Sequence, residues 1–191
     1  MRTTRTGRGI KSISSCAGGV VLALAFGSAW AQQQQPQPQK KDSAQPTYVA
    51  SYRDWSLFTY RDGNGKVCYI ASEPIKKDGN YARRGPAAVL VARFPMDPPN
   101  VQVSVQAGYA FKEKSEVEVK IDDRGFSLFT HGESAYARDA TADEQLIAAM
   151  KRGSQMTVRG TSQRGTWSLD TYSLQGFSAA YDAMLDACKK P

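Results

Sequence analysis

The stretch RGTSQRGTWSLDTYSLQGFSAAYDAMLDAC (residues 159–188) decides the fold, because its periodicity changes from that of a strand to that of a helix. Two strand-like runs, residues 155–161 and 166–172, flank a turn at residues 162–165 and predict a β-hairpin. From residue 177 the apolar side chains recur at helical spacing, at Phe177, Ala180, Tyr181, Met184, Leu185 and Cys188. This stripe predicts a C-terminal helix over residues 177–188 that lies on the sheet and turns Cys188 toward the core.

Strand-like patterns also fill the chain before this stretch. Six more segments are predicted as strands: residues 54–60, 66–72, 87–94, 101–106, 116–122 and 125–130. VQVSVQ (101–106) and EVEVKID (116–122) place apolar side chains on one face and polar ones on the other, which is typical of antiparallel strands with one face in water. DGNG (62–65) predicts a hairpin turn between the first two strands. The fold class is therefore mainly β: an antiparallel β-sandwich or barrel with one short helix and a C-terminal helix packed on the sheet.

The short helix is predicted over TADEQLIAAMKRG (residues 141–153). Thr141 is the expected N-cap and Glu144 completes a capping box with it. Lys151 and Arg152 fall in the last turn, where cations are favourable, and Gly153 ends the helix.

The N-terminus predicts export. Arg2, Arg5, Arg8 and Lys11 precede an apolar run at residues 17–29 that is too short to span a bilayer, and Ala29-Trp30-Ala31 is a cleavage signal. We expect a secretory signal peptide at residues 1–31, cleavage between Ala31 and Gln32, and no transmembrane anchor in the mature form. The expected location is periplasmic, or secreted to the outer surface.

A Gln- and Pro-rich segment, residues 32–47, follows the leader and predicts a disordered linker, so the folded domain is expected at residues 48–191. Removing the leader's four basic residues lowers the net charge from +7 to +3. This mild charge, without any basic run interleaved with aromatic residues, argues against nucleic acid as a partner.

Two cysteines, Cys68 and Cys188, remain after the leader is removed. In an oxidising compartment we expect a disulfide between them, with two buried free thiols as the alternative. Such a bond closes a loop of about 120 residues, which the chain-entropy description values at roughly 4–5 kcal/mol.

No sequence pattern for catalysis is present. The single histidine, His131, has too few companion ligands for a metal site, and no nucleophile elbow or phosphate-binding loop occurs. We expect no cofactor and no metal, and a protein that is not an enzyme. The alternatives that stay open are a periplasmic hydrolase with a site near His131 or Asp170, and a periplasmic inhibitor or chaperone-like interactor.

Two predicted loops concentrate positive charge. KKDGNYARRGP (76–86) and RGTSQRGT (159–166) contain six candidate anion-binding residues: Lys76, Lys77, Arg83, Arg84, Arg159 and Arg164. A pair of cationic loops suits an anionic envelope or host-surface component. The competing interpretations are ordinary solvated loops, a protein partner instead of an anion, and a cross-hairpin salt bridge from Arg164 to Asp170.

Five motifs together resemble one family: RDWSLFT (53–59), KVCY (66–69), VSVQAGYAFK (103–112), RGTSQRGT (159–166) and DTYSLQGF (170–177). With the leader and the terminal cysteine, they resemble the invasion-associated locus B family of Gram-negative bacteria. The resemblance implies an exported, periplasmic or surface-associated protein, linked in pathogens to entry into host cells. No catalytic residues are established for that family, so the resemblance adds none here. The resulting hypothesis is a non-enzymatic envelope or surface protein that acts as a binding module; the sequence leaves its oligomeric state open.

Overall fold

The computed structural model describes residues 45–189 except 97 and 99. These residues belong to one compact unit, Lys41–Pro191. The predicted leader, its cleavage site at Ala31 and Gln32, and residues 32–44 of the predicted linker lie outside the described residues. The first strand begins at Thr47, one residue before the predicted start of the domain.

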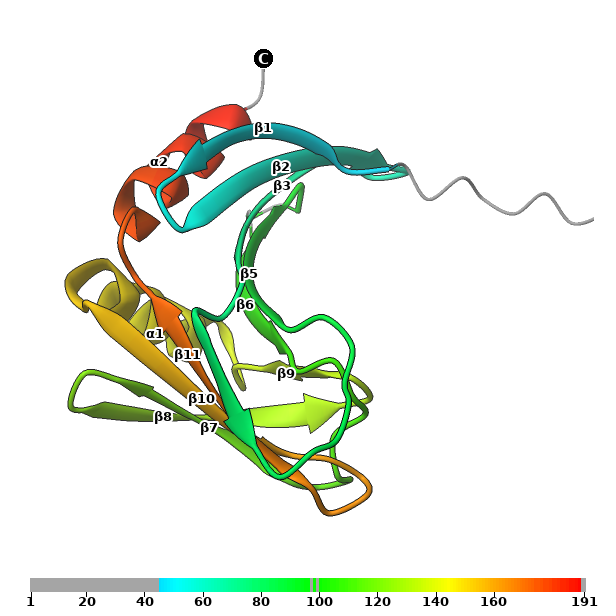
Figure 1. Cartoon of the computed structure of the whole chain (residues 1–191). Coiled ribbons are helices and arrows are strands. Elements are labelled where there is room, and N and C mark those ends of the chain that lie inside the picture. Colours follow the sequence, from blue (N-terminus) through cyan, green and yellow to red (C-terminus); the bar gives the residue numbers. More distant parts are fainter. Residues whose placement is uncertain (1–44, 97, 99, 190–191) are drawn as a thin grey trace, which may run out of the picture. The chain divides into compact units, whose positions relative to one another are not determined.

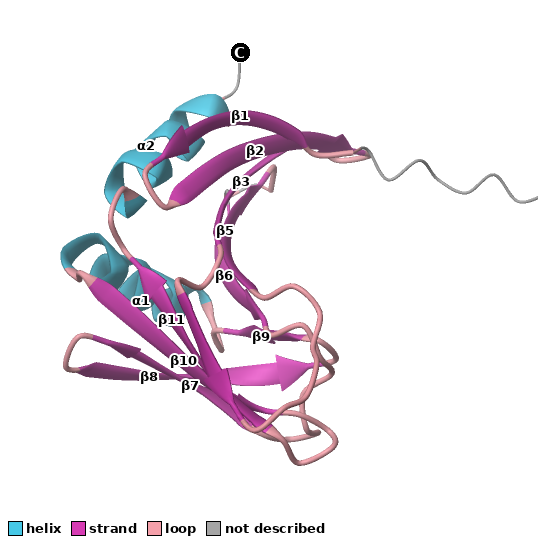
Figure 2. Ribbon diagram, viewed as in Figure 1, coloured by secondary structure: helices cyan, strands magenta, loops and turns pink. Residues whose placement is uncertain are grey.

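The described residues form one eleven-stranded sheet in which every pairing is antiparallel (Figures 1 and 2). The strands are β1 (Thr47–Tyr52), β2 (Trp55–Asp62), β3 (Gly65–Ser72), β4 (Lys76–Gly79), β5 (Ala88–Phe94), β6 (Asn100–Gln106), β7 (Glu116–Ile121), β8 (Arg124–His131), β9 (Ser134–Tyr136), β10 (Gln155–Thr161) and β11 (Trp167–Ser173). Their order in the sheet is β1-β2-β3-β5-β6-β9-β8-β7-β10-β11-β4. The predicted mainly-β, antiparallel class is confirmed.

The core lies where the inward faces of both halves of this curved sheet meet. Alternate residues supply it: Val89 and Val91 on β5 and Val117 on β7 are all fully buried. Glu116, Glu118 and Lys120, which alternate with the buried β7 residues, are exposed. The period-two pattern therefore predicted which side chains share a face, since successive side chains of a strand point to opposite sides.

The two predicted helices are α1 (Ala140–Arg152) and α2 (Phe177–Ala187). Helix α1 packs on β6, and α2 packs on β1, β2 and β3 (Figure 1). The N-cap prediction for α1 was wrong: the cap is Asp139, whose carboxylate accepts a hydrogen bond from the Ala142 N–H at 2.8 Å. Because the Asp139 side chain can accept from the first turn, the cap lies two residues before the predicted Thr141.

Helix α2 is attached to the sheet in two ways. Phe177, at its first turn, packs edge-on against Trp55 at 4.9 Å between ring centroids, and the Trp55 indole donates to the Ser173 carbonyl at 3.1 Å. At its other end, Cys188 forms a disulfide with Cys68 in the middle of β3, with 5.9 Å between the Cα atoms. The predicted disulfide is confirmed.

Three strands were not predicted. β1 lies at one edge of the sheet, and β9 has only three residues. β4 has the sequence KKDG, whose residues are poor strand formers. β4 forms because β11 offers it a free edge, with Lys77 opposite Asp170. Pairing with a distant segment thus overrides local preference here.

A buried carboxyl group makes stability depend on pH. Asp143, in the first turn of α1, is 5% exposed, and its carboxylate accepts a hydrogen bond from the Val103 N–H at 2.8 Å. Strand β9 pairs only with residues 104–106 of β6, so Val103 has no partner on β9. Burial raises the pKa of Asp143 to about 6; the hydrogen bond from Val103 opposes this rise, and the nearby Asp139 adds to it. Below the pKa of the unfolded state, such a carboxyl group does not change the free energy of unfolding. As the pH rises from there through the folded-state pKa of about 6, the group progressively lowers that free energy.

We expect Asp143→Asn to raise the free energy of unfolding at pH 7 by on the order of 1–3 kcal/mol. The neutral amide avoids the cost of burying a charged carboxylate, and its oxygen can still accept the hydrogen bond from the Val103 N–H. Below pH 4 the two proteins should unfold with nearly equal free energy. Denaturant titrations at several pH values measure this difference. A constant difference across pH 4–7 would contradict the assignment.

Candidate functional site

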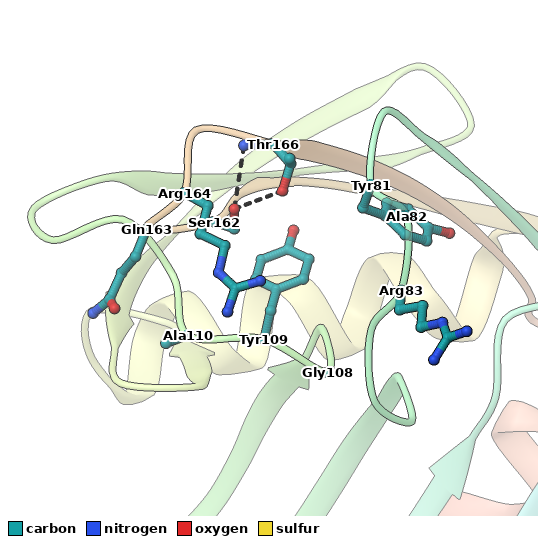
Figure 3. Close-up of a pocket in the computed structure, with 10 residues that line it drawn as sticks. All are labelled: Tyr81, Ala82, Arg83, Gly108, Tyr109, Ala110, Ser162, Gln163, Arg164 and Thr166. Atoms are coloured by element: carbon teal, nitrogen blue, oxygen red, sulfur yellow. Dashed lines mark hydrogen bonds between the residues drawn. The ribbon is translucent and has the colours of Figure 1, made fainter.

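Three loops surround a pocket of ≈ 680 Å³ at one end of the sheet (Figure 3). They are the loop after β4, the loop after β6 and the turn between β10 and β11. The lining residues are Tyr81, Ala82, Arg83, Gly108, Tyr109, Ala110, Ser162, Gln163, Arg164 and Thr166. Among these residues are two arginines and no carboxylate, so the pocket is cationic.

The loops after β4 and β6 touch through glycine. Gly108 has φ of 74°, and a Cβ at this position would lie 2.2 Å from the Gly85 carbonyl oxygen. In return, the Gly85 N–H donates to the Gly108 carbonyl at 2.8 Å. Glycine at residue 108 is therefore required for this close approach, which joins the two loops that contribute Arg83 and Tyr109 to the pocket.

The turn between β10 and β11 is held by its own polar side chains. The hydroxyls of Ser162 and Thr166 are 2.6 Å apart, and the Thr166 N–H donates to the Ser162 hydroxyl at 3.2 Å. The Gln163 N–H also donates to the Ala110 carbonyl at 2.9 Å, which joins this turn to the loop after β6. The RGTSQRGT motif is thus a hairpin turn that presents Arg164 to the pocket.

Below the pocket, the inward face of β11 is polar. Ser168, Asp170 and Tyr172 are 1%, 2% and 0% exposed. The hydroxyls of Ser168 and Tyr109 are 2.7 Å apart, which fixes the Tyr109 ring in the pocket wall. Burial raises the pKa of Tyr109, although Ser168 and Arg84 act in the opposite direction, so its hydroxyl stays protonated.

Arg84 and Asp170 form a buried ion pair beneath the pocket. Two guanidinium nitrogens of Arg84 donate to the two carboxylate oxygens of Asp170, and the side chains are only 4% and 2% exposed. Arg84 also donates to the Ala107 carbonyl at 3.1 Å and lies over the Tyr81 ring, 4.6 Å from its centroid. Burial acts to lower the pKa of Arg84, but Asp170 more than offsets it, and the net pKa is raised. The pair ties the loop after β4 to β11.

The Tyr172 hydroxyl, two residues along β11 from Asp170, is buried and has no hydrogen-bond partner among the described residues. Burial is the main cause that raises its pKa, and the charge of Asp170 adds to it. The inward face of β11 therefore carries one unsatisfied polar group as well as an ion pair, an uncommon content for a β-sheet core.

The six predicted anion-binding residues lie in different environments, and only two of them line the pocket. Arg83 and Arg164 line the pocket, which brings the two predicted cationic loops together. Arg84 is buried in its ion pair with Asp170, so the alternative interpretation of Arg164 as a cross-hairpin partner of Asp170 does not hold.

The other three predicted cations do not line this pocket. Arg159 is on β10 and lies over the Trp167 ring at 4.9 Å. Lys76 and Lys77 are exposed on β4, a strand and not the predicted loop. Tyr109 and Ser162 were not predicted as site residues; the Gly-Tyr pair after β6 was the one available signal for Tyr109.

The residues considered for hydrolysis are not brought together. His131 is exposed at the end of β8, whereas Asp170 is buried in the middle of β11 and bound to Arg84. Within the described part of the chain, no three histidine, cysteine or acidic side chains are grouped so that they could hold a metal ion. No helix in that part is both long and apolar enough to cross a bilayer.

Comparisons with known proteins give one family match and one similar fold. The model of the family described as "Invasion associated locus B (IalB) protein" matches residues 55–185. The crystal structure of invasion associated protein B from Bartonella henselae is similar in fold, with a TM-score of 0.53 and 17% sequence identity over 75% of this chain and 99% of that chain. The search of curated proteins found no match.

Proposed function

Because the chain belongs to the invasion associated locus B family, we propose that it is an exported, non-enzymatic binding protein of the cell envelope or cell surface. The pocket between the three loops holds an anionic component of the envelope or of a host surface. The leader directs export, and cleavage after Ala31 leaves the linker and the folded domain.

The observation that carries this proposal is the pair of exposed arginines that line the pocket. Neither Arg83 nor Arg164 has a carboxylate within 4.0 Å among the described residues, whereas Arg84, between them and the core, is fully paired. The guanidinium group is the side chain best suited to bind a phosphate or carboxylate with two parallel hydrogen bonds. The two free arginines therefore favour an anionic ligand.

Two tyrosines and the polar turn add uncharged groups to the binding surface. Tyr81 and Tyr109 contribute rings, and Gln163 contributes an amide to the same pocket. A volume of ≈ 680 Å³ falls within the range of small-molecule sites and admits a sugar-sized group with its acidic substituent. The ligand chemistry that fits is a phosphate or carboxylate carried on a sugar.

The test is binding of the purified protein, from Gln32 onward, to lipopolysaccharide, to an acidic glycan and to anionic vesicles without sugar. We expect the double variant Arg83→Gln/Arg164→Gln to weaken binding of the sugar-bearing ligands by roughly tenfold or more, and added salt to weaken it further. The comparison of the three ligands identifies the source of the anion.

The matched control is Arg152→Gln/Arg159→Gln, which removes the same charge from two exposed arginines outside the pocket. Equal loss in both double variants would mean that net charge alone drives binding, and the proposal would then fail. Preference for plain vesicles would also count against a sugar-bearing ligand.

A further inference from the structure

A second pocket, of ≈ 390 Å³, lies beside the disulfide and shares no residue with the first. It is formed by the β2–β3 hairpin, the end of β5 and the residues that follow α2. Cys188 itself lines it. The family assignment and the proposed function do not account for this pocket.

One side of this second pocket is cationic. Arg61, Lys66, Arg93 and Lys189 line it, and no aspartate or glutamate is among the described residues that line it. Arg61 and Lys66 are direct cross-strand partners on β2 and β3. Like charges directly opposite each other destabilise a sheet, so this pair lowers the stability of the hairpin.

Helix α2 accounts for two of these cations. The Lys66 ammonium donates to the Ala187 carbonyl at 2.7 Å, and the Arg93 guanidinium donates to the Leu185 carbonyl at 3.2 Å. Both bonds satisfy the carbonyls at the C-terminal end of the helix, where cations are favourable. Lys189 pairs with Asp186 at 2.6 Å.

Arg61 is the exception. It is exposed, and it has neither a hydrogen bond nor an ion pair from its side chain among the described residues. Its position opposite Lys66 places a guanidinium that no described residue pairs with at the pocket. A bound anion would remove the repulsion between these two side chains.

The other side of the pocket is apolar. Phe94, Pro95 and Met96 line it, and Met96 is 57% exposed, so its side chain is open to a ligand. Pro95 packs closely on the hairpin, 3.2 Å from where a Cβ of Gly65 would lie, so the apolar wall directly adjoins the cationic one. A cationic wall beside an apolar wall suits a ligand that has an anionic group at one end and an apolar chain at the other.

We propose that this second pocket binds an anionic amphiphile: a carboxylate or phosphate head group at Arg61 and Lys66, with a short acyl chain against Phe94, Pro95 and Met96. Because Cys188 lines the pocket and Ala187 holds Lys66, the disulfide keeps the cationic wall in place.

The test uses decanoate, decyl phosphate, decanol and inorganic phosphate as probes, each below its aggregation concentration. Amide chemical shifts locate binding, and calorimetry measures affinity for the purified chain. We expect decanoate and decyl phosphate to bind at residues 61–66 and 93–96, and Arg61→Gln to weaken both by roughly fivefold to tenfold. Met96→Ser should weaken the same two probes and leave the melting temperature unchanged, because Met96 is exposed.

The control is Arg124→Gln, an exposed arginine on β8 outside this pocket, which should bind both probes like the unmodified protein. The proposal is overturned if decanol binds as tightly as decanoate, which would leave the cations without a role. It is equally overturned if inorganic phosphate binds as tightly as decyl phosphate, or if Arg61→Gln and Arg124→Gln behave alike.

Discussion

Replacing Cys68 and Cys188 together by alanine is expected to lower the free energy of unfolding by about 4–5 kcal/mol, the largest effect of any change considered for this fold. The bond joins residues 120 apart in sequence, so its loss greatly increases the freedom of the unfolded chain. It also releases the end of α2 from β3. For a domain of this size the melting temperature should fall by roughly 10 °C or more, which scanning calorimetry measures.

Reducing agent provides the control for the disulfide. It should lower the melting temperature of the unmodified protein toward that of the double alanine variant and leave the variant unchanged. Cys68 is fully buried, so part of the variant's loss comes from the missing sulfur atom in the core, and the reductant experiment is free of this contribution. Equal melting with and without reductant would show that the bond contributes nothing.

Removing one member of the buried ion pair is expected to cost about 3–5 kcal/mol, because the remaining charge is left uncompensated in the core. Arg84→Met leaves the Asp170 carboxylate without its two donors, and Asp170→Asn leaves the Arg84 guanidinium without its charge partner. Urea unfolding at pH 7 measures both. The loops around the first pocket should loosen as well, because Arg84 also holds Tyr81 and the Ala107 carbonyl.

The double variant Arg84→Met/Asp170→Leu separates charge from packing. With both charges gone, most of the lost stability should return, since a buried pair is often replaced by apolar residues at little cost. The exposed pair of Arg138 and Glu116, with side chains 65% and 49% exposed, is the matched control: Arg138→Gln should change stability by at most about 1 kcal/mol. A single Arg84 or Asp170 variant as mild as this control would contradict the assignment of a buried pair.

The two pockets and the ion pair differ in how much of them could be predicted. The cationic loops at residues 76–86 and 159–166 were recognisable from their composition, and the structure brings Arg83 and Arg164 to one pocket. Arg84, their neighbour in sequence, has a different role because its side chain turns toward β11. Composition cannot distinguish adjacent arginines; the direction of each side chain depends on the strand it meets.

The second pocket was not predicted at all. Its cations come from β2, β3, β5 and the chain end, and each of them looks like an ordinary surface residue in its own segment. Only the cross-strand register, with Arg61 opposite Lys66 and Arg93 opposite Cys68, brings them together. Register depends on pairing between strands, which a single-segment pattern does not contain.

The sequence by itself determined the strands with clear alternation, both helices and the Cys68–Cys188 bond. These follow from local periodicity and from the number of cysteines, and neither requires knowledge of a distant partner. Tertiary structure decided the rest: that KKDG becomes a strand beside β11, and that the polar face of β11, with Ser168, Asp170 and Tyr172, points inward. Alternation shows which side chains share a face of the strand. Which face points into the core depends on where the rest of the fold supplies hydrogen-bond and ion-pair partners. On β11 those partners are Arg84 and Tyr109, supplied by loops far away in sequence.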